Sequence, residues 1–437
     1  MSRKITLFVC VLVCALVQES FSAGPGQSAS VTSVSYLFAK ATAVVEVKLA
    51  VESLKKKDLV ECKRLLVEAK DLNPGIPAPD IILAQLIFEA GGAGEAISVL
   101  DQYAIEAPSD PLTYVLLGEI ALKTRRFTDA WLHSEKAIAL GVKPTEELRL
   151  ALSVLQGEIA LNRKQWSVAE NAFGEWAKLR TDEAAPIWAQ GKLKLLQEDF
   201  EGAKTTFAKA RGIDSTLPQP QFFIASYLSS KPENDQCEEW YRDGLKAKDS
   251  TMENWQGYIS WLVSRGRAAD AGKLTERVSK EFQEKREMRF LGALVARYLG
   301  KNDLAEKGFS DLHQQFPDDV EAADQLALVL VESTEEGKRA RAQQLSEANV
   351  RRFPNQEVTI ATAAWIQFKL GSADIADRIF SELASKTPVS PQTGYYIAQL
   401  MKARGKEEDA KKILEAIVKQ PGNFVQRKSV LEALEKE

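Results

Sequence analysis

The sequence predicts an all-helical fold in which one helix–turn–helix unit is repeated along the chain. Three observations support this prediction. A small residue returns at a constant interval, and a second small residue stands upstream of it in nearly every unit. Moreover, no segment alternates apolar and polar residues as a half-buried strand would, whereas residues 199–210 show the spacing of three and four that is typical of an amphipathic helix.

The recurring small residue occupies eleven positions, and eight of the ten intervals between them are identical. The two longer intervals hold extra residues near 142–146 and around 333–337, where turn-forming residues gather and insertions are tolerated. The positions are Cys62, Ala96, Ala130, Ala169, Ala203, Cys237, Ala271, Ala305, Ala342, Ala376 and Ala410.

Two further columns accompany the first. An upstream column is Gly or Ala in all units but one: Ala50, Ala84, Gly118, Gly157, Gly191, Ala225, Ile259, Ala293, Ala327, Ala364 and Ala398. A column four residues downstream is mostly bulky: Leu66, Leu100, Phe173, Phe207, Tyr241, Phe309, Phe380 and Leu414. Small residues on both helices allow two helices to approach closely, and the bulky residue fills the space beside the contact.

A 34-residue helix pair with Gly or Ala, then Ala, then Phe or Tyr, then Pro resembles the tetratricopeptide repeat (TPR). The prolines stand twelve residues after the first column, at Pro74, Pro108, Pro317, Pro354 and Pro388. The resemblance covers about residues 43–422, and it implies a right-handed TPR-type α-solenoid of about eleven repeats.

Residues 1–22 have the features of a secretory signal peptide. Arg3 and Lys4 precede an apolar run from Ile5 to Val17, and Ser20 and Ser22 offer small side chains for cleavage near Ser22. We expect a mature chain that is secreted or periplasmic, with an uncleaved signal anchor as the alternative. No later segment is apolar enough to span a membrane, so no membrane span is expected after cleavage.

Two segments flank the repeat array. Residues 23–42 are expected to be a linker and a leading helix, and residues 31–54 are compatible with one long helix that enters the first repeat. Residues 423–437 are expected to form a helix that caps the last repeat. The residues expected to face inward from this helix are Val430, Leu431 and Leu434.

The composition argues against several functional classes. Lys and Arg total 57 against 61 Asp and Glu, a net charge of −4, so no basic surface for nucleic acid is indicated. The two histidines, His133 and His313, lie five repeats apart and lack a metal-binding spacing. Cys62 and Cys237 are also five repeats apart, which is too far for a disulfide. We therefore expect no catalytic residue, metal or cofactor, and no enzymatic activity.

The resemblance also implies a binding surface. In such proteins the fifth and ninth positions of each first helix line the concave groove and contact ligands. On this sequence those positions hold large rings and a lysine, which we predict to bind a partner. They are Trp188, Lys192, Phe222, Phe290, Trp365 and Tyr395. The alternative is that individual rings pack between neighbouring repeats.

These observations predict a protein–protein interaction scaffold of an extracytoplasmic compartment. It would bind peptide or helix segments of other proteins in its groove, in a setting such as an envelope secretion or assembly complex. Two alternatives stay open: a structural solenoid that associates with other copies of itself, and an accessory subunit of an envelope enzyme.

Overall fold

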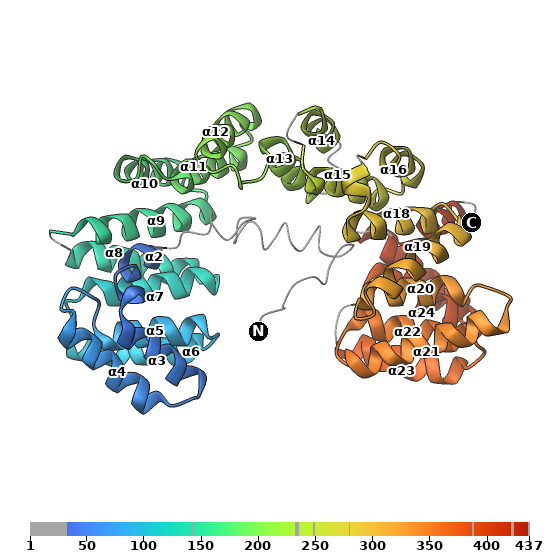
Figure 1. Cartoon of the computed structure of the whole chain (residues 1–437), viewed down its shortest axis with the longest axis horizontal. Coiled ribbons are helices and arrows are strands. Elements are labelled where there is room, and N and C mark those ends of the chain that lie inside the picture. Colours follow the sequence, from blue (N-terminus) through green and yellow to red (C-terminus); the bar gives the residue numbers. More distant parts are fainter. Residues whose placement is uncertain are drawn as a thin grey trace. The chain divides into compact units, whose positions relative to one another are not determined.

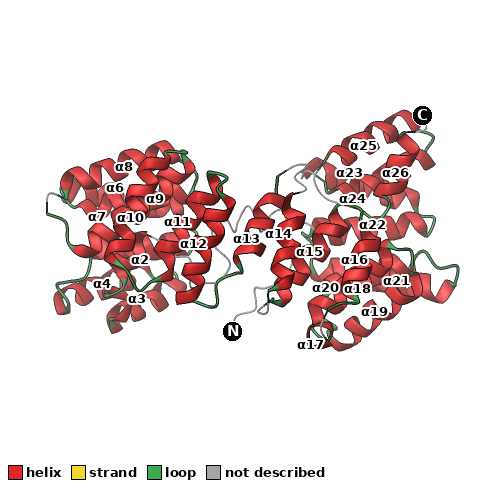
Figure 2. Cartoon of the chain, turned by 90° about the horizontal axis from the view of Figure 1, so that it is seen from above, coloured by secondary structure: helices red, strands yellow, loops and turns green. Residues whose placement is uncertain are grey.

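A computed structural model describes residues 33–141, 143–231, 236–247, 250–278, 280–386, 389–420 and 424–435. Within these ranges every regular element is a helix and none is a strand (Figure 2). The prediction of an all-helical fold is therefore confirmed. The predicted signal peptide, residues 1–22, lies outside the described residues. No helix in the described ranges is both long and apolar enough to cross a membrane.

The chain divides into two compact units, and residues 23–220 form one of them. After the short helices α2 (Ser33–Phe38) and η1 (Ala41–Ala43), this unit consists of successive helix pairs, each with a first and a second helix (Figure 1). The pairs are α3 (Val45–Lys55) with α4 (Leu59–Leu72), α5 (Pro79–Glu89) with α6 (Ala93–Glu106), α7 (Pro111–Lys123) with α8 (Phe127–Leu140), α9 (Glu146–Asn162) with α10 (Trp166–Leu179), and α11 (Ala184–Leu196) with α12 (Phe200–Ile213).

The other unit contains residues 221–437 and continues the same arrangement. Its pairs are α13 (Pro220–Ser229) with α14 (Gln236–Lys246), α15 (Met252–Ser264) with α16 (Ala268–Thr275), α18 (Arg286–Tyr298) with α19 (Asn302–Gln315), α20 (Val320–Leu330) with α21 (Glu336–Arg352), α22 (Glu357–Lys369) with α23 (Ala373–Lys386), and α24 (Pro391–Ala403) with α25 (Glu407–Lys419). The short α17 (Lys280–Gln283) precedes α18, and α26 (Arg427–Leu434) follows the last pair.

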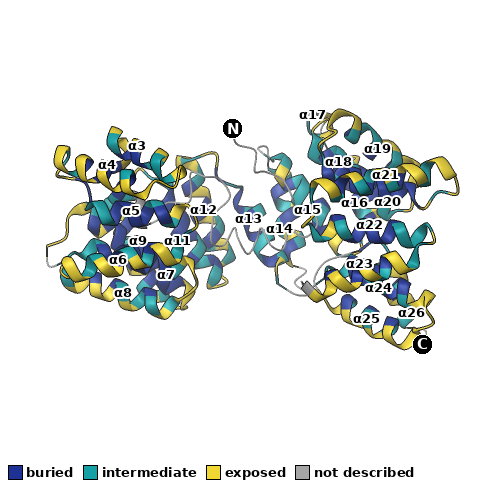
Figure 3. Cartoon of the chain, turned by 90° about the horizontal axis from the view of Figure 1, so that it is seen from below, coloured by how far each residue is buried: buried dark blue, intermediate teal, exposed yellow. Residues whose placement is uncertain are grey.

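The recurring small residues lie where the paired helices touch. Every member of the first column, from Cys62 to Ala410, has no exposed surface, and the upstream column is buried as well. Figure 3 colours all buried residues dark blue, and first helices such as α5 and α7 carry much of this colour. Because a larger side chain would separate the helices, the predicted role of these columns in close packing is confirmed.

In most pairs, a residue in the left-handed backbone conformation follows the first helix, and there the chain turns into the second helix. Glycine fills this position in five pairs, where it adopts the positive φ without steric strain: Gly91, Gly266, Gly300, Gly371 and Gly405. Polar residues adopt the same conformation at Lys57, Arg125, Lys164 and Glu198. Because the turn is the same, the first and second helices are connected in the same way in each of these pairs.

The leading segment differs from the expectation. Residues 31–54 do not form one helix, because the chain turns between α2 and η1 and becomes extended at Val44, with φ −73° and ψ 135°. The turn allows both Phe38 and Ala41 to be buried, at 7% and 1% exposure. A continuous helix would carry α2 along the α3 axis and lose these contacts.

The last helix matches the expectation in part. On α26, Val430 is 6% exposed and Leu434 packs against the same apolar cluster, which includes Leu414 and Phe424. The prediction that Leu431 faces inward is wrong, since 39% of this residue is exposed. Successive helical residues differ by about 100° around the axis, so Val430 and Leu434 share a face that Leu431 does not.

Candidate functional site

Three of the six residues predicted to line a groove lie in the core. Trp188 is 1% exposed and packs on Phe207 of its paired helix, with ring centroids 4.3 Å apart. Phe290 is 4% exposed and lies 5.5 Å from Phe309 in the same manner. Trp365, at 6% exposure, stacks on a ring of the next first helix. The expectation that these three rings are displayed on a surface is therefore corrected.

The physical reason is the position of the first helices. A first helix contacts its own second helix and also the first helices before and after it, so most of its circumference is covered. A large ring at the fifth position turns into those contacts instead of toward solvent. The alternative that individual rings pack between neighbouring repeats thus describes Trp188, Phe290 and Trp365.

The other three predicted residues are half-buried. Lys192 on α11 forms an ion pair with Glu158 on α9, at 3.1 Å. Phe222 lies against Tyr241, with centroids 6.2 Å apart, and Tyr395 lies 5.7 Å from the ring of Phe424. Partner binding by these residues stays a prediction.

The leading helix α2 occupies the first-helix side of its unit. It packs against α7 and α9, two first helices far from it in sequence, and Figure 1 shows α2 beside them. Phe38 belongs to the apolar cluster that also holds Leu148 and Leu152 of α9, and Leu37 packs against the same cluster. This docked segment was not foreseen from the sequence.

Tyr36 inserts its phenol between the end of α10 and the start of α11. Trp176 donates a hydrogen bond from Nε1 to the Tyr36 hydroxyl at 2.8 Å, and that hydroxyl donates to a carboxylate oxygen of Glu183. The Trp176 ring meets the Tyr36 ring edge to face at 6.4 Å, and the Arg180 guanidinium lies 5.4 Å from the Tyr36 ring centroid. We call Trp176, Arg180 and Glu183 the tyrosine cradle.

The electrostatics of the cradle keep the phenol protonated. Burial raises the pKa of Tyr36, and the hydrogen bond to Glu183 raises it further. The proton is therefore available to Glu183 throughout the physiological pH range. Arg180 is itself held by ion pairs with Glu146 at 2.6 Å and with Glu183 at 3.3 Å. The cradle thus presents one donor, one acceptor and one cation in fixed positions.

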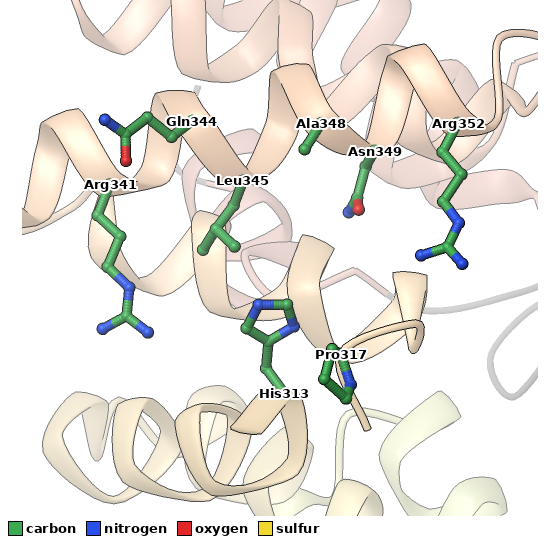
Figure 4. A pocket seen from close by; sticks show the side chains of 8 residues that line it. All are labelled: His313, Pro317, Arg341, Gln344, Leu345, Ala348, Asn349 and Arg352. Atoms are coloured by element: carbon green, nitrogen blue, oxygen red, sulfur yellow. The ribbon is translucent and has the colours of Figure 1, made fainter. Parts of the chain in front are cut away.

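A second feature is a hollow of about 260 Å³ between α19 and α21 in the other unit (Figure 4). His313 points from α19 toward α21, with Arg341 and Arg352 on either side. Burial, together with nearby Arg341, lowers the pKa of His313, so its imidazole is neutral at pH 7. Arg352 is paired with exposed Asp318 at 2.7 Å. Arg341 and Arg352, which line the hollow, are exposed.

The described histidines and cysteines lie within the packing of the helices. Among the described residues, no three or more His, Cys, Asp or Glu side chains are grouped so that they could hold a metal ion. His133 stacks on Tyr114 with nearly parallel rings, and burial lowers its pKa. Cys62 and Cys237 are buried in the small-residue column. These groups have packing roles.

One sequence signal points toward the cradle in retrospect. Apart from Val31 and Val34, residues 23–35 are polar or small, and the large apolar side chains of Tyr36-Leu37-Phe38 follow them directly. Large apolar side chains in a linker are expected to pack against an apolar surface of the protein, because this removes them from water. The sequence does not show which surface, because Glu183 lies 147 residues away and belongs to no recurring column.

No protein-family model matches the sequence, and no curated protein matches it. Solved structures of helical-repeat proteins are similar to it at low identity. Cut9–Hcn1 of APC/C has a TM-score of 0.35 and 12% identity, with 88% of this chain and 81% of that chain covered. Yeast Tom70 has a TM-score of 0.35 and 13% identity, with 91% and 96% covered. A tetratricopeptide repeat protein from Parabacteroides merdae has a TM-score of 0.38 and 12% identity, with 65% and 98% covered. These likenesses are too distant to assign a function.

Proposed function

We propose that this protein is a non-enzymatic interaction scaffold whose first-helix side binds short segments of partner proteins. The docking of α2 on α7 and α9 carries this proposal. That surface holds a helical segment through apolar contacts, a paired phenol hydrogen bond and an ion pair. The Tyr36 and Lys40 side chains bond to Glu183 and Glu147, which lie 147 and 107 residues away in the chain. Helix-in-groove binding likewise places the apolar face of a helix on an apolar surface.

Site-specific photo-cross-linking in the native host tests the scaffold function. A benzophenone amino acid is placed at Lys192 on the first helix α11, or at Leu132 on the second helix α8, where 61% of the residue is exposed. We expect defined adducts with other proteins from position 192 and none from position 132. The same adducts from both positions, or none from position 192 in a folded variant, would contradict the proposal.

We further propose that the scaffold works outside the cytosol, in an envelope secretion or assembly complex. The basic start, apolar run and small residues of 1–22 support export. Fusing residues 1–30 to a reporter that is active only outside the cytosol tests this, with mass spectrometry to locate the cleavage after Ser22. An inactive, unprocessed fusion would contradict export. Partners trapped at position 192 should themselves be exported proteins.

A structural role through self-association is the second candidate, and one observation favours it. The first helix pair exposes several apolar side chains: Val45 at 62%, Leu49 at 50%, Val60 at 84% and Val67 at 44%. Light scattering over a range of concentrations tests this candidate. A mass that rises with concentration, and that stays monomeric after Val60→Asp, would support stacking of copies through this pair.

A further inference from the structure

We propose that the tyrosine cradle is a binding site for a tyrosine-bearing helical segment of a partner protein, and that α2 occupies this site in cis until such a segment displaces it. The inference rests on the proposed function, because it names the chemistry of the partner and the regulation of the same surface. The contacts of Tyr36 with Trp176, Glu183 and Arg180 carry the proposal.

Two residues of the cradle form hydrogen bonds with the phenol hydroxyl. Trp176 donates to the oxygen of Tyr36 and Glu183 accepts its proton, so both hydrogen-bonding functions of the hydroxyl are used. A phenylalanine in the same place would leave the Trp176 N–H and the Glu183 carboxylate without this partner. A site built to bond a hydroxyl rejects the analogue that lacks it far more strongly than an apolar pocket rejects an extra group.

The cradle does not depend on α2 for its shape. Trp176 lies in α10, Arg180 directly follows that helix, and Glu183 directly precedes α11. Helix α10 packs against both α9 and α11 through contacts that do not involve α2. The donor, the acceptor and the cation therefore stay in place when α2 leaves, and the site is pre-organised for another ligand.

The α2 segment has the properties of an exchangeable ligand. It has six residues, and a helix of that length is not stable by itself in water. Its ion pair between Lys40 and Glu147 is largely exposed and adds little. The tether to α3 keeps its effective concentration on the order of millimolar, so a partner segment must compete with it. Weakening α2 should therefore raise the apparent affinity for the partner.

The contacts of α2 define the partner segment that fits. A tyrosine enters the cradle, and two apolar residues directly after it join the apolar cluster to which α9 contributes, as Leu37 and Phe38 do. A basic residue four positions after the tyrosine reaches Glu147, as Lys40 does. The partner is therefore a short helix that carries tyrosine, two apolar residues and then a lysine or arginine.

Two fluorescent peptides test the proposal against the full chain. One has the sequence of residues 31–43, and the other places the same tyrosine, apolar and lysine residues on an unrelated alanine-based helix. The release variant Tyr36→Ala/Phe38→Asp weakens α2 and leaves the cradle intact. We expect both peptides to bind this variant at least tenfold more tightly than the wild type. Replacing tyrosine by phenylalanine in either peptide should weaken binding at least tenfold.

Further variants distinguish specific recognition of the tyrosine from non-specific peptide binding. Adding Trp176→Phe to the release variant should abolish the preference for tyrosine over phenylalanine peptides. The control Tyr103→Ala removes a tyrosine that is hydrogen-bonded to Asp110 elsewhere in the same unit, and it should leave peptide binding at the wild-type level. Circular dichroism confirms that each variant keeps its helicity.

Three results would overturn the proposal. The first is no binding of either peptide to a folded release variant, and the second is equal binding of tyrosine and phenylalanine peptides. The third is a wild-type mass that doubles with concentration and stays monomeric in the release variant, because α2 of a second copy would then be the occupant. Adducts at position 192 test the scaffold function independently, so the two proposals can fail separately.

Discussion

The ring of Phe173 occupies the space that a side chain on Gly157 would need. A Cβ atom on Gly157 would lie 2.2 Å from Cε1 of Phe173, well inside any van der Waals contact. The same relationship holds between Gly191 and Phe207, where the distance would be 2.5 Å. In both pairs the glycine of the first helix and the bulky residue of the second helix thus fit together as one packing unit.

Gly157→Ala is expected to destabilise the protein by about 1–3 kcal/mol, because the methyl group must displace a fully buried ring. The better helix propensity of alanine, worth about 1 kcal/mol, offsets part of this loss. Urea unfolding measures the change. Gly174→Ala is the control, since nothing lies within 4 Å of its Cβ and only the gain in propensity applies. Equal effects of both substitutions would show that the ring is not constrained.

Ala203→Trp is expected to lower the melting temperature, because this residue has no exposed surface and the paired helices touch there. Overpacking of a core typically costs about 1–3 kcal/mol. Ala208→Trp on the same helix is the matched control, since Ala208 is exposed and should change the melting temperature little. If Ala203→Trp melts at the wild-type temperature, the small-residue column does not mark the helix contacts.

These packing columns could be predicted from sequence because each is a local requirement repeated at a fixed spacing. Close approach of two helices favours a small residue on each, so Gly, Ala or Cys recurs at both positions in all units except the one that holds Ile259. The constant spacing then fixes which helices pair. The pattern therefore predicted the helix pairs and the burial of the eleven small residues in the column that begins at Cys62 and ends at Ala410.

The candidate site could not be predicted in the same way. The periodic position of Trp188 or Phe290 does not reveal whether the ring turns toward solvent or toward the next helix, since this depends on the rotation of each helix in its packing. The docking of Tyr36 against Trp176 and Glu183 is a single, non-repeating contact between segments far apart in the chain. No period in the sequence contains information about it.

Tyr36→Phe is expected to loosen α2 without unfolding the helix pairs. Loss of the hydroxyl leaves the Trp176 N–H and the Glu183 carboxylate without their partner, which typically costs about 1–3 kcal/mol. Hydrogen exchange of residues 33–43 should become roughly tenfold faster or more, while α5 to α8 exchange as in the wild type. Tyr103→Phe removes a comparable hydroxyl from α6 and should leave exchange of α2 unchanged. Unchanged exchange in Tyr36→Phe would mean that the phenol does not hold α2.

Asp324 on α20 gives the protein a predictable pH dependence. This carboxylate is 3% exposed and accepts hydrogen bonds from Nδ2 of Asn349 at 2.8 Å and Oγ1 of Thr359 at 2.9 Å. Burial raises the pKa of Asp324 to about 6, although both hydrogen bonds oppose the shift. Between its unfolded pKa near 3.8 and that value, the folded state binds more protons than the unfolded state. Its contribution to stability therefore falls as pH rises through this range and is constant above it.

Asp324→Asn removes the ionisation and should flatten this part of the pH dependence. Relative to the wild type, the variant is expected to gain on the order of 3 kcal/mol between pH 4 and pH 7, because only the wild type must bury a charge at the higher pH. Urea unfolding of both proteins at each pH measures the difference. Asp318→Asn serves as the control, since Arg352 lowers the pKa of the exposed Asp318 below its usual 3.8. Its contribution to stability therefore changes mainly below pH 4, and this variant should show little change relative to the wild type between pH 4 and pH 7. A difference between Asp324→Asn and the wild type that does not change with pH would show that Asp324 titrates alike in the folded and unfolded states.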